Sequence, residues 1–230
     1  MDKIDLPLRN RVQAGRALGA ALGAYRGRRD LLVLALPRGG VPVACEIADA
    51  LGAEVDLLIV RKLGTPGQEE LAMGAIASGG ARVLNRDVIE SLQVPERAIA
   101  EVERRERREI ERREAAYRGQ RARPAVAGQC VILVDDGVAT GATMRAGIAA
   151  LRQGKPSRIV AAVPVAPPET VDLLRGEADE VVCLAAPEPF RAIGYWYVEF
   201  PQLSDEEVRA RLALSWARRP AAGAAFAGRA

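Results

Sequence analysis

Short, almost continuous apolar runs alternate with amphipathic segments along most of this chain. Each of five runs predicts a strand: 31–36 (LLVLAL), 55–60 (VDLLIV), 130–134 (CVILV), 157–163 and 180–184. Runs of this kind are typical of parallel strands covered on both faces. Four segments predict helices: 8–25, 41–51, 142–153 and 168–174. The alternation therefore predicts an α/β fold with an open, mostly parallel, doubly wound sheet of about five strands.

Two further segments interrupt this alternation. Residues 61–80 are rich in glycine and contain Pro66, and we expect their first half to be a long mobile loop, with a short strand at 81–85. Residues 95–117 predict a highly charged helix with Glu and Arg four positions apart. A solvated helix is the preferred interpretation of this segment. The alternative is a partner-binding or dimer-forming helix that uses four apolar positions: Ile99, Val102, Ile110 and Tyr117.

The chain has 230 residues, of which 49% are hydrophobic and 27% charged, enough to bury the core of one domain. We expect this domain to span residues 1–215 and the low-complexity end, 216–230, to be disordered. The formal net charge is only +3, with basic and acidic residues interleaved. Nucleic-acid binding is therefore not expected, and a charged small molecule is a better fit.

Histidine is absent from the sequence, which excludes Ser-His-Asp triads, zinc sites with histidine ligands and phosphohistidine chemistry. The cysteines Cys45, Cys130 and Cys183 are widely spaced and lie in or beside apolar runs. They predict reduced core residues of a cytoplasmic protein. The charged first residues and the short apolar stretch after them predict neither a signal peptide nor a membrane span.

Polar residues follow three of the predicted strands, where ligands bind in open parallel sheets. They are Pro37-Arg38-Gly39-Gly40, Arg61-Lys62, and the turn from Asp135 to Thr143. In that turn, glycines allow successive N–H groups to converge, the next helix points its positive end there, and two threonines add hydroxyl donors. This arrangement predicts a cradle for a monophosphate. The acids Asp135 and Asp136 suit the vicinal hydroxyls of a sugar and a hydrated magnesium ion.

The segment Val131 to Thr143, VILVDDGVATGAT, resembles the phosphoribosyl pyrophosphate (PRPP) signature of type I phosphoribosyltransferases. PRGG stands where this family has its pyrophosphate loop, often with a cis peptide, and Arg61-Lys62 opens a segment similar to its mobile lid. The resemblance extends from Leu31 to Leu184, and it is closest to the uncharacterised bacterial phosphoribosyltransferase-like proteins. Neither a P-loop lysine nor a G-x-G-x-x-G motif after the first strand is present.

The resemblance implies that PRPP donates phosphoribose to a nitrogenous acceptor, and that pyrophosphate leaves with Mg²⁺. It implies catalytic roles for Arg38, Lys62, Asp135 and Asp136, the last two also holding the metal mainly through water and the ligand. The implied PRPP contacts are Arg38, Gly39, Gly40, Arg61, Lys62, Asp135, Asp136, Gly137, Val138, Ala139, Thr140, Gly141, Ala142 and Thr143.

The family also has a hood over the acceptor, which the resemblance places in residues 1–28 and 186–203, and a lid, placed in 61–80. An aromatic patch lies in the second hood segment: Phe190, Tyr195, Trp196, Tyr197 and Phe200. These rings either stack on a planar base or pack the hood against the sheet. The sequence after the last strand matches no purine, orotate or uracil motif of the family, so the acceptor stays open, as does a homodimer.

Two other functions compete with this one. A PRPP- or nucleotide-sensing regulator would keep the same pocket without strong catalysis. A protein that accepts a phosphoryl group on Asp135 or Asp136, as in receiver-like α/β folds, is a third hypothesis. The Gly/Thr turn directly after the acids has no role in such a protein, and its site usually lies on an early strand.

Overall fold

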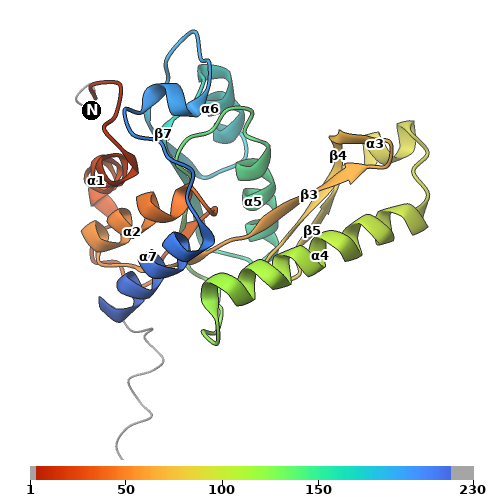
Figure 1. Cartoon of the computed structure of the whole chain (residues 1–230), viewed down its shortest axis with the longest axis horizontal. Helices are drawn as coiled ribbons and strands as arrows, with labels where there is room; N and C mark the ends of the chain where they lie inside the picture. The colour runs from red at the N-terminus through yellow and green to blue at the C-terminus, as the bar shows by residue number, and fades with distance from the viewer. Residues whose placement is uncertain (1–3, 219–230) are drawn as a thin grey trace, which may run out of the picture.

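A five-stranded parallel sheet forms the body of the protein (Figure 1), and the computed structural model describes residues 4–218. The strand order is β2-β1-β6-β7-β8, and all neighbours are parallel. The strands are β1 (Leu31–Ala35), β2 (Glu54–Leu57), β6 (Cys130–Val134), β7 (Arg158–Val165) and β8 (Glu180–Ala185). The expected open parallel sheet is confirmed.

Helices cover both faces of this sheet. On one face lie α1 (Arg11–Ala21), α2 (Gly40–Leu51) and α7 (Asp205–Arg218), and on the other lie α5 (Ala142–Gln153) and α6 (Pro168–Arg175). Successive strand residues point to opposite faces, so one β1 residue, Val33, packs in the core beneath α2 and its neighbour Leu34 in the core beneath α5. This double coverage explains why the strands read as continuous apolar runs.

Residues 60–118 form an arm that extends from the body (Figure 1). The arm contains β3 (Val60–Thr65), β4 (Gln68–Ala77), β5 (Arg82–Leu84), α3 (Arg86–Ser91) and α4 (Glu96–Arg118). The three strands form an antiparallel sheet in the order β3-β4-β5, and α4 packs along it. A two-residue turn at Pro66 and Gly67 joins β3 to β4, with a φ of 79° at Gly67.

The expectation of an irregular loop in the first half of 61–80 is wrong, and so is the single strand over 55–60. β2 ends at Leu57 and β3 starts a second sheet at Val60. Glycine in this segment marks close backbone approach in a sheet rather than a loop. A Cβ atom would come 2.6 Å from the Glu69 carbonyl oxygen at Gly64, and 2.5 Å from that of Val83 at Gly74.

Helix α4 has a solvated outer face and a buried inner face. Three of the expected ion pairs four residues apart are present: Glu103–Arg107, Glu109–Arg113 and Glu114–Arg118. A fourth pair with the same spacing, Glu101–Arg105, is replaced, because Arg105 pairs with Glu106. The apolar positions Ile99, Val102, Ile110 and Tyr117 are all buried in the core of this same chain. They are therefore not available to a partner, and the alternative of a partner-binding helix built on them is wrong.

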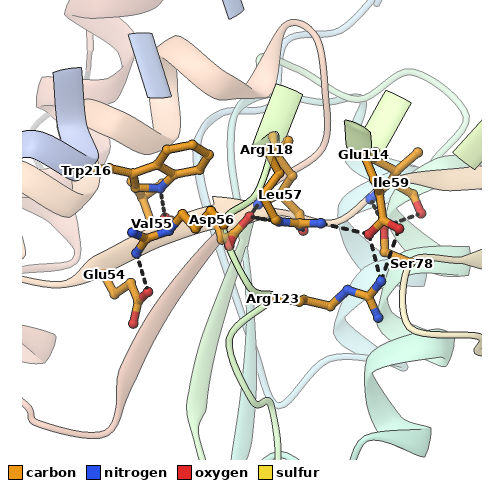
Figure 2. A network of polar contacts seen from close by, with 11 residues as sticks. Glu54, Val55, Asp56, Leu57, Ile59, Ser78, Glu114, Arg118, Arg123 and Trp216 are labelled. Carbon is orange, nitrogen blue, oxygen red and sulfur yellow. Dashed lines mark hydrogen bonds and ion pairs between the residues drawn. The ribbon is translucent and has the colours of Figure 1, made fainter. Parts of the chain in front are cut away.

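A buried ion pair fixes the C-terminal end of α4 to the body (Figure 2). The side chain of Asp56 on β2 is fully buried, and its Oδ1 accepts from Arg118 Nε at 3.0 Å and Nη2 at 2.9 Å. Arg118 also donates to Glu114, which Arg123 contacts from the loop that follows. Trp216 of α7 donates to the Val55 carbonyl on the same strand. The arm, β2 and α7 are thus joined at one point.

The C-terminal helix α7 was not predicted. Residues 216–218 belong to it, so the expected disorder is wrong where it begins, and residues 219–230 lie outside the described part of the chain. A sequence signal was present: three acids in the first turn and Arg218 in the last complement the helix dipole, with Val208 and Leu212 four positions apart. Between residues 4 and 218, no helix has the length and hydropathy needed to cross a bilayer.

Candidate functional site

The turn between β6 and α5, residues 135–141, leaves backbone donors free at the start of a helix. Gly141 precedes α5 with a φ of 78°, and no side chain caps the helix there. Within residues 4–218, the amides of Ala139, Thr140 and Gly141 have no hydrogen-bond acceptor. Val138 differs, because its amide donates to the Val165 carbonyl at 2.9 Å. The free donors and the positive end of α5 make this turn a candidate site for an anion.

A cavity of about 140 Å³ lies over this turn. Its lining consists of Asp135, the residues from Gly137 to Met144, and Ile193. Asp136 is not part of this lining. One residue of the acid pair therefore lines the cavity together with the residues that carry the free amides, and the other does not.

Asp135 is half-buried, and its Oδ1 accepts from the Asp136 amide at 2.9 Å. Burial raises the pKa of Asp135 well above its usual range, and the neighbouring charge of Asp136 adds to this effect. A divalent cation would favour the ionised form again. Residues 4–218 contain no cluster of three or more metal-ligating side chains, so a magnesium ion would need oxygens from a bound ligand, the mode in which Mg²⁺ usually binds beside phosphates.

Asp136 is buried and tied to other elements. Its Oδ2 lies 2.7 Å from Arg11 Nε on α1, and its carbonyl accepts from the Tyr197 hydroxyl at 2.6 Å. Arg11 also donates to the Pro201 carbonyl and lies 3.8 Å above the Phe200 ring. No local signal pointed to Arg11, because an arginine on an amphipathic helix is most often solvated, and Tyr197 was expected only as one ring of the aromatic patch.

Burial raises the pKa of the Tyr197 hydroxyl, with the charge of Asp136 as the second cause, so this group remains a donor. Replacing Tyr197 by Phe would leave the buried Asp136 carbonyl without that donor. We expect a loss of about 1 kcal/mol in the free energy of unfolding, measured by urea titration. The matched change Tyr195→Phe, on a side chain that is 60% exposed, should stay within about 0.5 kcal/mol of the wild type. Equal effects of the two changes would contradict this prediction.

The loop after β1 packs directly against the acid pair. The Pro37–Arg38 peptide is cis, and a Cβ atom at Gly39 would overlap the carboxylate of Asp136. At Gly40 it would come 2.6 Å from the Val134 carbonyl oxygen. Only glycine allows the loop to lie this close to β6. The structure therefore brings the predicted PRGG loop and the predicted acid pair together at the carboxyl ends of β1 and β6.

Arg38 points toward the junction of α7 and α4. Its Nη1 lies 3.7 Å from Asp205, the first residue of α7. Asp205 also accepts from the Tyr117 hydroxyl at 2.7 Å, and its carboxylate lies 4.0 Å from Arg112. Asp205 was not among the predicted site residues, since the helix that carries it was not predicted.

Arg61 and Lys62 lie on β3 and line a second, polar cavity of about 310 Å³. Thr143 lines this cavity and the small cavity over the turn, so the two cavities are adjacent. Arg61 pairs with Glu106 of α4, with its Nε at 2.8 Å. Lys62 is 3.9 Å from Glu70, whose side chain is fully exposed. The basic pair thus lies next to the turn but comes from a sheet of the arm.

The two terminal segments pair with each other beside the turn. The Leu8 amide donates to the Trp196 carbonyl, and the Val198 amide donates to the Leu8 carbonyl, both at 2.8 Å. Ile193 reaches the turn, since a Cβ atom at Gly137 would come 2.5 Å from its Cγ2. Two of the aromatic rings pack inward: Tyr197 is 6% exposed and stacks on Phe200.

Known proteins resemble this chain in sequence and in fold. The sequence model of a family described as "Phosphoribosyl transferase domain" matches residues 9–196. Two Mycobacterium tuberculosis proteins, from strains CDC 1551 / Oshkosh and ATCC 25618 / H37Rv, each carry a name that contains the words "phosphoribosyl transferase". Each is 46% identical over 203 residues, which cover 88% of this chain and 46% of the relative. The chain thus spans about half the length of these curated relatives.

Solved structures also match most of the chain, and one of them is similar in sequence as well. It is the crystal structure of TT1426 from Thermus thermophilus, with 43% sequence identity and a TM-score of 0.80. The match covers 89% of this chain and 97% of the other.

Proposed function

Since the chain belongs to the phosphoribosyl transferase family, we propose that it is a magnesium-dependent phosphoribosyltransferase. It binds PRPP and transfers phosphoribose to a nitrogenous, nucleobase-like acceptor with release of pyrophosphate. One observation carries this proposal: free amides, a helix N-terminus and Asp135 share one small cavity, and the PRGG loop packs beside it. A sugar phosphate needs this combination of donors and acceptors.

The turn binds the 5-phosphate of PRPP. The amides of Ala139, Thr140 and Gly141 donate to its oxygens, and the amides at the start of α5 add their dipole. Thr140 on the turn and Thr143 in the first turn of α5 line the same cavity, and their hydroxyls supply further donors. The Val138 amide does not donate to the phosphate, because it already donates to the Val165 carbonyl on β7. Val138 therefore only lines the site.

Asp135 accepts from the ribose hydroxyls and, with Asp136 through water and the ligand, holds Mg²⁺. A magnesium ion held by these residues would supply positive charge opposite the pyrophosphate group. Asp136 adds negative charge next to the ribose while it remains paired with Arg11. The negative charges of the two carboxylates thereby stabilise the positive charge that develops on the ribose ring as the bond to pyrophosphate breaks.

The PRGG loop, Arg61 and Lys62 receive the pyrophosphate. The acceptor nitrogen forms a bond to the anomeric carbon while the bond from that carbon to the pyrophosphate oxygen breaks. The electron pair leaves with pyrophosphate, and the acceptor then loses its proton to solvent. Arg38, Lys62 and the amides of Gly39 and Gly40 stabilise the leaving group, and removal of one such donor typically costs about 10²–10³ in rate.

We place this reaction in the cytoplasm, since Cys45, Cys130 and Cys183 are free thiols. The hood of the proposed enzyme consists of the paired terminal segments, and its lid is the hairpin of β3 and β4. PRPP and the acceptor are its small-molecule partners. The proposed function is compatible with a homodimer.

The direct test mixes the protein with PRPP, Mg²⁺ and a panel of nucleobases and other nitrogen acceptors, and measures the release of pyrophosphate. We expect release that depends on PRPP, on Mg²⁺ and on one class of acceptor. Calorimetric binding of PRPP without turnover across the panel would instead favour the sensing regulator. Absence of both binding and turnover would reject the proposed function.

A further inference from the structure

Three cations are candidates to bind the phosphates of PRPP, and only one of them has a close, buried carboxylate partner. Arg38 lies 3.7 Å from Asp205, and both side chains are more than a third exposed. Lys62 lies 3.9 Å from the fully exposed Glu70. Arg61 lies 2.7 Å from Glu106, whose side chain is only 9% exposed. The Arg61 guanidinium is therefore the most firmly held of the three.

Glu106 binds two arginines at once. Its Oε2 accepts from Arg61 Nε at 2.8 Å and lies 2.7 Å from Arg61 Nη2. Its Oε1 accepts from Arg105 Nε at 3.0 Å. One carboxylate between two guanidinium groups leaves one net positive charge. It also occupies only one edge of Arg61, so the other N–H groups of the guanidinium can donate elsewhere.

Arg61 lines a cavity that borders the turn of residues 135–141. Arg61, Glu106 and Thr143 line one polar cavity of about 310 Å³, and Thr143 also lines the small cavity with Asp135. The helix that carries Glu106 cannot easily shift, because its end is fixed to β2 by the buried Asp56–Arg118 pair (Figure 2). A long side chain held in one conformation loses less entropy when it binds an anion.

We propose that Glu106 is a positioning residue that holds the Arg61 guanidinium at the cavity beside the turn of residues 135–141, so that its free N–H groups donate to the pyrophosphate group of PRPP. This inference rests on the proposed function, since it needs PRPP as the ligand. Glu106 does not touch the ligand and acts only through Arg61. The arm, with α4, thus takes part in the site rather than serving only as a cover.

The test measures PRPP affinity by calorimetry in the presence of Mg²⁺ for Glu106→Gln, which removes the charge and keeps the size. We expect roughly 10-fold weaker binding, the lower end of what loss of an orienting outer-shell partner costs in metal sites. Glu106→Asp keeps the charge and should bind more tightly than Glu106→Gln. In an Arg61→Ala background, Glu106→Gln should have no further effect, a result that a purely structural role would not give.

The matched control is Glu103→Gln, one turn earlier on α4. Glu103 also pairs with two arginines, Arg107 and Arg82, at 2.7 and 2.9 Å, and Arg82 belongs to the arm sheet. We expect its PRPP affinity to equal that of the wild type. If Glu103→Gln weakens binding as much as Glu106→Gln, or if Glu106→Gln still weakens binding without Arg61, the inference is overturned. If the wild type binds PRPP and Glu106→Gln binds equally well, only this inference fails, whereas a wild type that does not bind PRPP removes the proposed function with it.

Discussion

Asp135→Asn is expected to weaken the binding of magnesium and PRPP by roughly 10- to 150-fold, because a hydrogen bond to a charged group contributes about 1.5–3 kcal/mol. Asp135 lines the cavity over the turn, and its carboxylate accepts from the neighbouring Asp136 amide, which an Asn oxygen can also engage. The fold should therefore be unchanged. Calorimetry with PRPP and Mg²⁺ measures the affinity, and thermal unfolding measures the stability.

Asp136→Asn should behave differently from Asp135→Asn. It neutralises the partner of Arg11, a side chain that is itself only 10% exposed, and we expect a loss of about 1–3 kcal/mol in stability. The double change should abolish detectable PRPP affinity and lower the melting temperature. Asp30→Asn, which removes a half-exposed carboxylate before the amino end of β1, is the control and should change neither quantity. An unchanged dissociation constant for Asp135→Asn would refute its assignment to the ribose and the metal.

Asp56→Ala is expected to lower the free energy of unfolding by about 3 kcal/mol, which corresponds to roughly 6–12 °C in melting temperature for a chain of this size. The change leaves the buried guanidinium of Arg118 without its fully buried carboxylate partner inside the core. Glu114 still pairs with Arg118, so we expect the lower end of the usual cost of an unpaired buried charge, about 3–5 kcal/mol. Urea and thermal unfolding both measure this loss.

Two controls separate the buried pair from charge effects in general. Asp172→Ala removes a carboxylate that is 72% exposed and pairs with Arg175 on the surface of α6, and its effect should stay below about 0.5 kcal/mol. The double variant Asp56→Leu with Arg118→Met removes both charges and should be closer to the wild type than Asp56→Ala. If Asp56→Ala leaves the melting temperature unchanged, the Asp56–Arg118 pair does not hold α4 to the sheet.

Local sequence signals were sufficient for the parallel sheet and for the turn after β6. A strand covered on both faces must be apolar throughout, so an apolar run such as 130–134 can be recognised as a strand from the sequence. The turn that follows needs glycines and small hydroxyl residues at fixed positions, and these requirements lie within nine consecutive residues. Both features depend on neighbours along the chain, which is the information that a sequence displays.

Segments whose conformation depends on distant contacts were predicted less well. The glycines of the arm favour a loop by local preference, yet Gly74 is needed for the close approach of the β5 backbone. Helix α7 was not predicted, although its charges fit a helix. In both cases the local preference was ambiguous, and packing against another element decided the outcome.

By itself, the sequence determined four of the five strands of the parallel sheet, and it showed that a Gly/Thr turn with two acids directly follows one of them, because these features depend on residues adjacent in the chain. Only the tertiary structure decided which acid faces the cavity and which cation each carboxylate binds. Arg11 is 125 positions from Asp136, and Arg61 is 45 positions from Glu106. In a chain with 33 basic and 30 acidic side chains, any of them could attract another, and the partners are chosen by the fold that brings them within hydrogen-bonding distance.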